Sequence, residues 1–265
     1  MITLEEVTEI LHKHKHKDEW LLGTHQGNDG NQGNTLEGLL GVVENNLRLP
    51  DLGDIELKTQ KAESGSFITL FHKEPLPRAS IPKLLKCLGW RHTEAGLKYK
   101  NDEMSFRSTT YAHRYSSRGF TIDLTDQKIN FVFSPANVSA LDRDLTSAFR
   151  TYGDWLADVE KRVPHYSSVL PVYWNRSDFE EYCIAKLDST LFCLLQTKKT
   201  NGKDYYKIEE AYIHKGFLRH NLQNLFADGS VVIDFDARTR HNHGTKLRIK
   251  KSHLHKIFEF SKKLL

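Results

Sequence analysis

Apolar residues recur at helical spacing along several stretches of this 265-residue chain. Spacings of three and four residues place such side chains on one face of a helix, where they can pack against a core. Asn34 or Thr35 offers an N-cap for one of these stretches, and Pro50 ends it. The pattern predicts helices over residues 3–17, 36–47, 141–163 and 252–265, with a short helix after the prolines of residues 74–85.

Alternation of apolar and polar residues predicts strands elsewhere. Residues 54–60, DIELKTQ, alternate in this way, and residues 66–71, SFITLF, offer an antiparallel partner. Further strands are predicted over residues 120–124, 128–133, 191–199, 205–213 and 231–238. This mixture indicates an α/β or α+β fold. No repeat or linker marks a domain boundary, and the arrangement of residues 75–205 stays open.

The composition is that of a globular protein. Hydrophobic residues make up 38% of the chain, which is too many for long disorder. No run of about 18 apolar residues occurs, and the start lacks the apolar block of a signal peptide, so we expect no membrane span and no leader. Three cysteines without metal-ligand spacing indicate a reducing cytosol. The net charge of +4 suits either simple solubility or an anionic partner.

An acidic cluster precedes and enters the first predicted strand. Residues two apart share one face of a strand, so Glu56 and Lys58 point the same way. Asp54 joins them if the strand begins that early. Asp51 lies just before, across a glycine that can turn the chain, and Glu37 in the preceding helix could face the strand.

This cluster has a plain interpretation and a chemical one. A solvated ion pair on a strand is common and contributes at most about 1 kcal/mol. Converging carboxylates repel one another, however, and usually hold a cation between them. All-oxygen ligands favour Mg²⁺ with some waters retained. Lys58 could then orient a water or stabilise charge on a phosphoryl oxygen, which is the chemistry of a nuclease.

Two longer stretches around these residues resemble a known family. The first runs from GNDGNQGNTLEGLLGVVENNLRLPDLGDIELKTQ, residues 27–60, into ITLFHKEP, residues 68–75. The second, HNHGTKLRI at residues 241–249, matches a His-x-His-Gly-Thr segment. In these residues the chain is similar to the MvaI/BcnI family of restriction endonucleases, which belongs to the PD-(D/E)xK nucleases and is related to the mismatch-repair nickase MutH. The similarity between the two stretches is weak.

The resemblance implies a PD-(D/E)xK core, a mixed β-sheet flanked by helices, within a single endonuclease over residues 1–265 whose two lobes form a DNA cleft. The catalytic lobe is expected around residues 20–75, and the recognition lobe includes residues 205–251. The family implies Mg²⁺-dependent cleavage of double-stranded DNA at a short GC-rich pseudo-palindromic site. It also implies a cytoplasmic monomer of a prokaryotic cell that nicks each strand in turn, with a cognate DNA methyltransferase as functional partner.

Residue by residue, the resemblance places Glu37, Asp51, Glu56 and Lys58 on the catalytic positions of the family. Asp51 follows a proline as the family pattern requires, although Asp54 has the better strand parity. Asp51 and Glu56 are expected to be metal ligands. Lys58 is expected to contact the attacking water. Glu37 is expected as a further ligand or as a carboxylate that holds water.

Candidate DNA contacts gather in the second stretch. Residues 238–251, RTRHNHGTKLRIKK, carry six Lys or Arg residues and no acid. A solvated basic strand explains such a run, but arginine paired with guanine is the commonest base-specific contact. The candidates are Arg238, Arg240, His241, His243, Lys246 and Arg248. The family carries an arginine near the position of Asp236, so its recognition sequence cannot be transferred.

Three further residues are weaker candidates for DNA contact. His72, next to the active-site strand, could approach DNA or be a surface histidine. Arg114 and Arg118 lie in STTYAHRYSSRG, residues 108–119, which fits a loop that clamps the DNA backbone and an exposed polar loop equally well. The HKHKHK run at residues 12–17 fits a charged helix end better than a metal site.

Two alternatives to a type II restriction enzyme stay open. A MutH-like nickase needs the same four catalytic residues, and cleavage of both strands of an unmodified duplex distinguishes the two enzymes. A DNA-binding relative without catalysis is the third hypothesis, and substitution of Lys58 would leave its behaviour unchanged.

Overall fold

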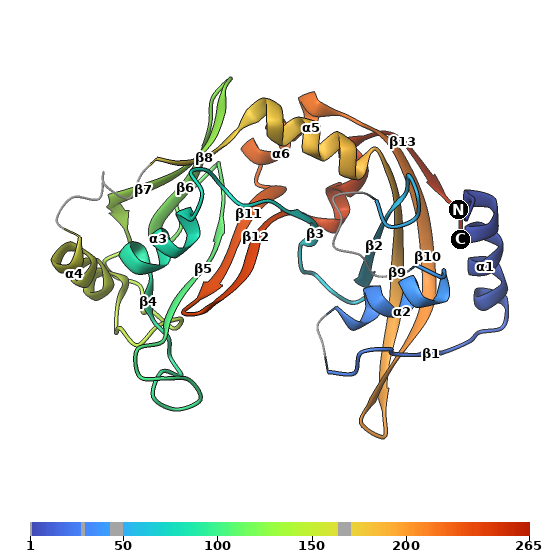
Figure 1. The fold of residues 1–265 in the computed structure, drawn as a ribbon, viewed down its shortest axis with the longest axis horizontal. Coiled ribbons are helices and arrows are strands. Elements are labelled where there is room, and N and C mark those ends of the chain that lie inside the picture. The colour runs from blue at the N-terminus through green and yellow to red at the C-terminus, as the bar shows by residue number, and fades with distance from the viewer. Residues whose placement is uncertain (1, 28–29, 43–49, 164–170) are drawn as a thin grey trace. The chain divides into compact units, whose positions relative to one another are not determined.

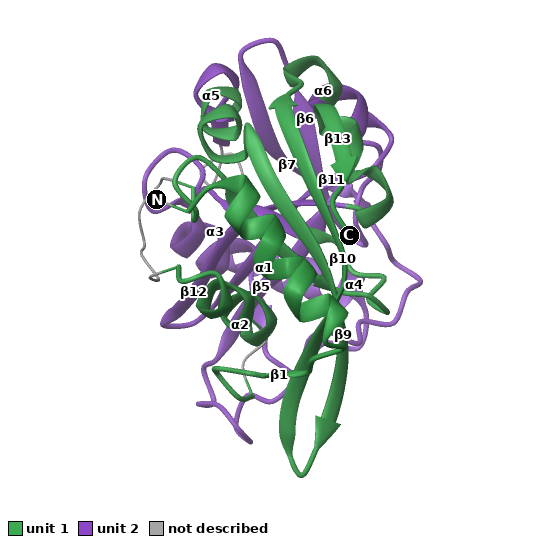
Figure 2. Ribbon diagram, turned by 90° about the vertical axis from the view of Figure 1, so that its right-hand side faces the viewer, with its two compact units in different colours: residues 1–68, 180–221, 250–265 green, residues 69–179, 222–249 purple. Residues whose placement is uncertain are grey.

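The computed structural model describes residues 2–27, 30–42, 50–163 and 171–265 (Figure 1). The chain forms two compact units, each assembled from separate stretches (Figure 2). Unit 1 contains residues 1–68, 180–221 and 250–265, and unit 2 contains residues 69–179 and 222–249. Residues 205–221, predicted to share a lobe with the C-terminal basic run, therefore belong to unit 1.

Unit 1 is built on a mixed β-sheet. The long antiparallel pair β9 (Ser189–Thr200) and β10 (Lys203–Phe217) forms its centre. Strand β2 (Glu56–Lys61) runs parallel to β9. Strands β1 (Leu21–Leu22) and β13 (Phe258–Lys263) both pair antiparallel with β10. The sheet thus joins segments from the beginning, the middle and the end of the chain.

One face of this sheet is covered by α1 (Leu4–His16) and α2 (Asn31–Leu39). The apolar side chains between them form one buried core, which includes Val7, Leu11, Leu36, Leu40, Leu191 and Cys193. Leu57 of β2 belongs to this core. Because successive strand residues alternate between faces, Glu56 and Lys58 point to the opposite face.

Unit 2 contains two sheets. The larger one has the order β3 (Ile68–His72), β12 (His241–Ile249), β11 (Val231–Arg238), β5 (Met104–Thr110) and β4 (Trp90–Arg91). The smaller one has the order β6 (Arg118–Leu124), β7 (Lys128–Val138) and β8 (Val172–Asn175). The helices are α3 (Ser80–Leu88), α4 (Tyr152–Arg162) and most of α6 (Arg219–Ala227). Phe106 packs against the rings of Phe120, Phe131 and Phe235, which joins the two sheets through an aromatic core.

Many predicted elements are confirmed. The first helix, the strand at residues 54–60, the two strand pairs over residues 120–133 and 191–213, and the strand at residues 231–238 are all present. The mixed α+β fold class is confirmed as well. None of the helices in the described parts of the chain is long and apolar enough to cross a membrane.

The predicted pairing of residues 54–60 with residues 66–71 is wrong. β2 pairs in parallel with β9, and β3 lies in the larger sheet of unit 2 beside β12. Nearness in sequence favours a hairpin, but hydrogen bonds to a distant buried strand decide the pairing here.

The limits of two predicted helices are also wrong. α2 begins at Asn31, before Asn34 and Thr35, and ends at Leu39, because Gly41 takes a positive φ of 71°. The predicted continuation over residues 43–47 lies outside the described residues. The helix predicted over residues 141–163 forms only from Tyr152, because Thr151 and Asp154 make a capping box that starts it there.

The predicted closing helix is wrong. Residues Lys251–Ile257 form a short 3-10 helix, and the chain then continues as β13. Pairing with β10 gives Phe258–Lys263 the backbone hydrogen bonds of a sheet, which outweigh a helical spacing of apolar residues.

Candidate active site

A tight turn brings Asp51 to the start of β2. Leu52 and Ile55 exchange backbone hydrogen bonds of 2.9 and 3.2 Å, and Gly53 between them takes a φ of +73°, a conformation that favours glycine. Oδ2 of Asp51 then accepts a hydrogen bond of 2.9 Å from the backbone N–H of Leu57. Asp54 lies exposed in the turn. The turn therefore presents Asp51, rather than Asp54, beside the strand.

Glu56 is the most deeply buried member of the site, with 1% of its surface exposed. One carboxylate oxygen forms an ion pair with Lys58, and the other, Oε2, lies 2.7 Å from Nζ of Lys186. Burial raises the pKa of Glu56, and Asp51 raises it further, whereas Lys58 and Lys186 act in the opposite direction. The buried carboxylate is held by two ammonium groups.

Lys186 completes a group that we call the carboxylate–lysine cluster: Asp51, Glu56, Lys58 and Lys186. Its Nζ lies 3.9 Å from Oδ1 of Asp51 as well as 2.7 Å from Glu56, so one cation bridges the two carboxylates. The residue comes from the last turn of α5 (Arg176–Leu187), where Cys183 and Leu187 are fully buried. The sequence prediction missed Lys186, because no motif connects this lysine with a strand more than a hundred residues earlier in the chain.

Glu37 occupies a different place. It lies half-buried on α2, and a Cβ added to Gly33 would stand 3.7 Å from its Oε1 and 3.6 Å from Oγ1 of Thr59. Thr59 alternates with Lys58 and so points to the helix-covered face of β2. The described residues contain no group of three acidic, histidine or cysteine side chains arranged to hold a metal ion. The structure brings Asp51, Glu56 and Lys58 together, and it places Glu37 on α2 beside Gly33.

The donor set of the cluster suits a hard divalent cation. Asp51 and Glu56 supply carboxylate oxygens only, and the two oxygens of Glu56 are held by the ammonium groups of Lys58 and Lys186. The ammonium of Lys186 lies between the two carboxylates, so their geometry already accommodates a positive charge. Oxygen ligands of this kind fit Mg²⁺, which commonly takes one or two carboxylates and retains several waters.

In unit 2, the larger sheet carries a row of charged residues that we call the charged sheet face: Arg107, Asp234, Asp236, Lys246 and Arg248. Lys246 pairs with Asp236 at 2.7 Å, Arg248 pairs with Asp234 at 3.0 Å, and Arg107 pairs with Asp236 at 3.0 Å. Burial disfavours the charge on Asp236, but Lys246 and Arg107 outweigh it and lower the pKa of that carboxyl group. Arg107 was missed in the sequence because it lies far from the basic run.

The His-x-His segment lies beside β3 in unit 2. The rings of His241 and His243 meet edge to face, with centroids 4.1 Å apart. Gly244 takes a φ of +88°, and a Cβ there would stand 2.8 Å from Cδ2 of His72, so glycine allows this histidine to approach. Burial, with the nearby His241, lowers the pKa of His243 despite the opposing effect of Asp236.

Comparison with known proteins identifies the chain. A model of the MvaI/BcnI restriction endonuclease family matches residues 9–258. The chain belongs to this family. Its resemblance to the MvaI/BcnI family, first observed in two short stretches, thus extends over nearly the whole sequence.

Solved structures of restriction endonuclease MvaI are similar as well. The complex with cognate DNA matches over 100% of both chains with a TM-score of 0.75 at 21% identity. The structure without DNA matches over 100% of both chains with a TM-score of 0.48 at 21% identity. The first match shows that the chain has the fold of this family. No curated protein sequence matches the chain.

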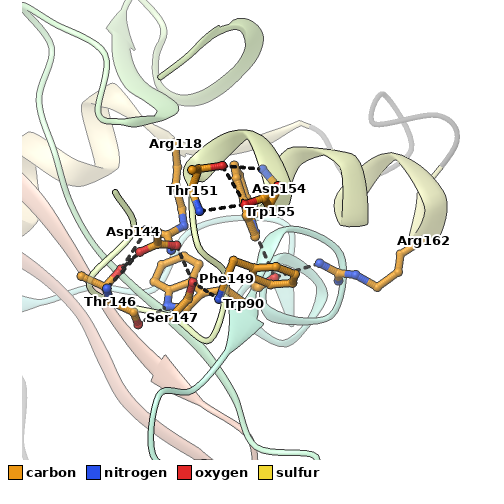
Figure 3. A network of polar contacts seen from close by, with 11 residues as sticks. Trp90, Arg118, Asp144, Thr146, Ser147, Phe149, Thr151, Asp154, Trp155 and Arg162 are labelled. Atoms are coloured by element: carbon orange, nitrogen blue, oxygen red, sulfur yellow. Dashed lines mark hydrogen bonds and ion pairs between the residues drawn. The ribbon is translucent and has the colours of Figure 1, made fainter. Parts of the chain in front are cut away.

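Within this MvaI/BcnI chain, Arg118 is not a surface residue, and the prediction that it contacts DNA is corrected. It is 6% exposed, and its guanidinium pairs with Asp144 and stacks 3.7 Å from the ring centroid of Trp90 (Figure 3). Thr146 accepts a further hydrogen bond from it. These contacts hold residues 141–150 in an irregular conformation, in place of the predicted helix.

The remaining candidates are placed as follows. Arg114 is exposed, with its guanidinium 4.3 Å from the ring centroid of Tyr111. Arg238 pairs with Glu103 at 3.0 Å, and Arg240 pairs with Asp102 at 3.2 Å. Both acids come from the segment before β5, so acids outside the basic run balance the charge of these two arginines.

Proposed function

We propose that this chain is a type II restriction endonuclease that cleaves phosphodiester bonds of double-stranded DNA at a short GC-rich pseudo-palindromic site with Mg²⁺. The observation that carries the proposal is the carboxylate–lysine cluster. In it, Asp51 and Glu56 lie on either side of the Lys186 ammonium, and Lys58 pairs with Glu56. Membership of a restriction endonuclease family supports nuclease activity on DNA. Its similarity in fold to MvaI in complex with cognate DNA supports double-stranded DNA as the substrate.

The residues of the cluster have separate roles in this proposal. Asp51 and Glu56 would hold Mg²⁺, which supplies Lewis-acid stabilisation of charge on the scissile phosphate when bound. Lys58, fixed against Glu56, orients the attacking water and stabilises developing negative charge. Lys186 neutralises the two carboxylates and limits the repulsion between them. Glu37 stays a proposed water-holding carboxylate, although it lies outside the cluster.

Recognition of DNA is assigned to unit 2. Arg238, Arg240, His241, His243, Lys246 and Arg248 are the proposed contacts to bases and phosphates, with His72 and Arg114 beside them and Arg107 added. The aspartates of the charged sheet face orient Lys246, Arg248 and Arg107 before DNA binds. Side chains held in fixed geometry lose less entropy on binding, and they discriminate between base edges because they do not readjust to a wrong pattern of donors and acceptors.

We propose that the enzyme acts in the cytoplasm of a prokaryotic cell as a monomer that nicks each strand in turn. A cognate methyltransferase would protect the host DNA. The proposal implies that nicked circles precede linear DNA when the substrate is a supercoiled plasmid.

The test is incubation of the purified chain with unmethylated plasmid and phage DNA, with Mg²⁺ or with EDTA. Discrete fragments that require Mg²⁺ support the proposal, and sequencing of their ends gives the site. Nicked circles alone would identify a MutH-like nickase. Binding without cleavage under every condition would overturn the assignment of the cluster as catalytic.

A further inference from the structure

A cavity of about 440 Å³ opens in unit 1 on the sheet face that α1 and α2 leave uncovered. Its floor contains Phe192 and Leu194 of β9, and Leu254 of the 3-10 helix contributes a further apolar wall. Cavities that bind small molecules are commonly of about this size and are mostly apolar with a few placed polar groups. The cavity therefore has the dimensions and the lining of a ligand site.

The register of the sheet connects this cavity with the carboxylate–lysine cluster. One cross-strand row runs Lys263, Tyr212, Phe192 and Lys58, and the next runs Ser261, His214, Thr190 and Glu56. Paired residues in a sheet point to the same face. Cavity residues of β9, β10 and β13 thus lie in the same rows, on the same face, as the candidate catalytic residues. Two strand spacings, about 10 Å, separate β10 from β2.

The most deeply buried polar side chain of the lining is His214, which is 3% exposed. Its Nδ1 lies 2.7 Å from Oγ of Ser261, and its Nε2 is buried without a hydrogen-bond partner among the described residues. Burial, with a smaller contribution from the charge of His255, lowers the pKa of His214 to about 4. A neutral imidazole with one unused nitrogen is costly to bury unless a ligand satisfies it.

Basic side chains form part of the lining. Lys251, His255 and Lys263 line the cavity, and its lining contains no carboxylate. The charge of Lys263 is balanced by Glu210, whose Oε1 lies 2.6 Å from Nζ of Lys263. Lys251 donates to the carbonyl of Ala62 at 2.9 Å and has no carboxylate partner in the described parts of the chain. An anionic group on a ligand would balance this charge.

The rings in the lining favour a flat ligand. Tyr212 and His214 lie nearly parallel, with an angle of 10° between their planes, and His214 stacks in turn on Phe258 at 15°. Of these rings, Tyr212 and His214 line the cavity together with Phe192, and they offer ring surface to a planar ligand.

We propose that this cavity binds a small anion that carries a planar aromatic ring and an acidic group, either carboxylate or phosphate. The acidic group lies at the rim formed by Lys251, His255 and Lys263, and the ring lies over Phe192 and Tyr212. A polar atom of the ligand bonds Nε2 of His214. This proposal is separate from the proposed nuclease activity, because none of the residues that line the cavity belongs to the carboxylate–lysine cluster.

The experiment is calorimetric titration of the full chain, without DNA, with naphthoate, naphthyl phosphate and the uncharged naphthamide. We expect one anion to bind per chain, with naphthamide at least about tenfold weaker because it lacks the charge. Tighter binding of naphthoate or of naphthyl phosphate identifies carboxylate or phosphate as the natural group. Equal affinity for naphthamide, or no saturable binding of either anion at millimolar concentration, would overturn the proposal.

Variants locate the bound ligand. Leu194→Trp fills the floor and should abolish binding, whereas Lys251→Met and His214→Phe should each weaken it about tenfold. Ile10→Trp is the matched control, because it lies in another hollow of unit 1, of about 410 Å³ and lined by Glu6 and Glu9, that would repel an anion. Circular dichroism checks the folding of each variant. Full affinity in folded Lys251→Met and His214→Phe would place the ligand elsewhere and refute the site.

Discussion

The carboxylate–lysine cluster of unit 1 and the charged sheet face of unit 2 both pair acidic with basic side chains, in different environments. In the cluster, the Glu56 side chain is 2% exposed, and burial raises the pKa of Glu56 although two lysines contact it. On the sheet face, Asp236 is 23% exposed and its basic neighbours lower the pKa of Asp236. Solvent access thus decides whether neighbouring cations outweigh the effect of burial on the pKa of an acidic side chain.

The difference has a functional consequence. A buried carboxylate that its neighbours only partly compensate binds an additional cation favourably, which suits metal-dependent chemistry. An ion pair whose cations outweigh the burial of the acid, and which is partly exposed to solvent, keeps its geometry. Its basic side chain can then exchange the acid for a base edge or a phosphate. The two regions would therefore divide chemistry and recognition between the two units.

The largest expected effect is on the cluster. Lys58→Ala should lower the cleavage rate by at least about a thousandfold, because the side chain that stabilises transition-state charge is lost. DNA affinity, measured by gel shift with Ca²⁺, should stay within about twofold, because the proposed phosphate contacts belong to unit 2. Lys61→Ala, an exposed lysine on the same strand, is the control. Unchanged cleavage by Lys58→Ala would contradict the proposal that the carboxylate–lysine cluster of unit 1 carries out the cleavage.

The buried ion pair of Arg118 and Asp144 in unit 2 tests whether a buried ion pair has a functional role or only a structural one. Arg118→Ala leaves Asp144 buried without its partner and should destabilise the protein by about 4 kcal/mol. Urea denaturation followed by tryptophan fluorescence measures the loss. DNA affinity of the folded variant should not change, in contrast to Arg114→Ala at the exposed position. A specific loss of DNA binding by Arg118→Ala would return this arginine to the recognition surface.

A pH titration of stability sharpens the comparison. Burial lowers the pKa of His214 from 6.5 to about 4, so the unfolded chain takes up the proton first as the pH falls. The stability from this neutral histidine is full above pH 6.5 and is lost as the pH falls toward 4. The expected loss is about 3 kcal/mol. His214→Phe should flatten this dependence in urea denaturation, whereas the exposed His220→Phe should not.

The smallest expected effect concerns recognition. Asp236→Asn releases Lys246 and Arg107 from their shared carboxylate, so discrimination between cognate and singly mismatched sites should fall by about tenfold. Competition cleavage assays with both duplexes measure the ratio, and Asp126→Asn, an exposed acid of unit 2, is the control. Unchanged discrimination would show that the charged sheet face does not read the bases.

Local patterns predicted the elements whose stability is local. The helix of α1, the β9–β10 pair and β11 follow from periodicity and turn residues. The alternation of Glu56, Leu57 and Lys58 also predicted correctly which side chains share a face. Predictions failed where a distant strand supplied the hydrogen bonds, as for β3 and β13, or where a buried charge held the chain out of a helix, as for Asp144.

The sequence by itself determined the family, the acidic cluster at the start of β2 and the residues that candidate chemistry needs. Only the tertiary structure showed that Lys186 bridges Asp51 and Glu56 and that Arg118 is buried. It alone aligned the His214 cavity with β2, which carries Glu56 and Lys58. The physical reason is that burial and through-space charge depend on which distant segments meet, whereas side-chain alternation and turn formation depend on neighbours along the chain.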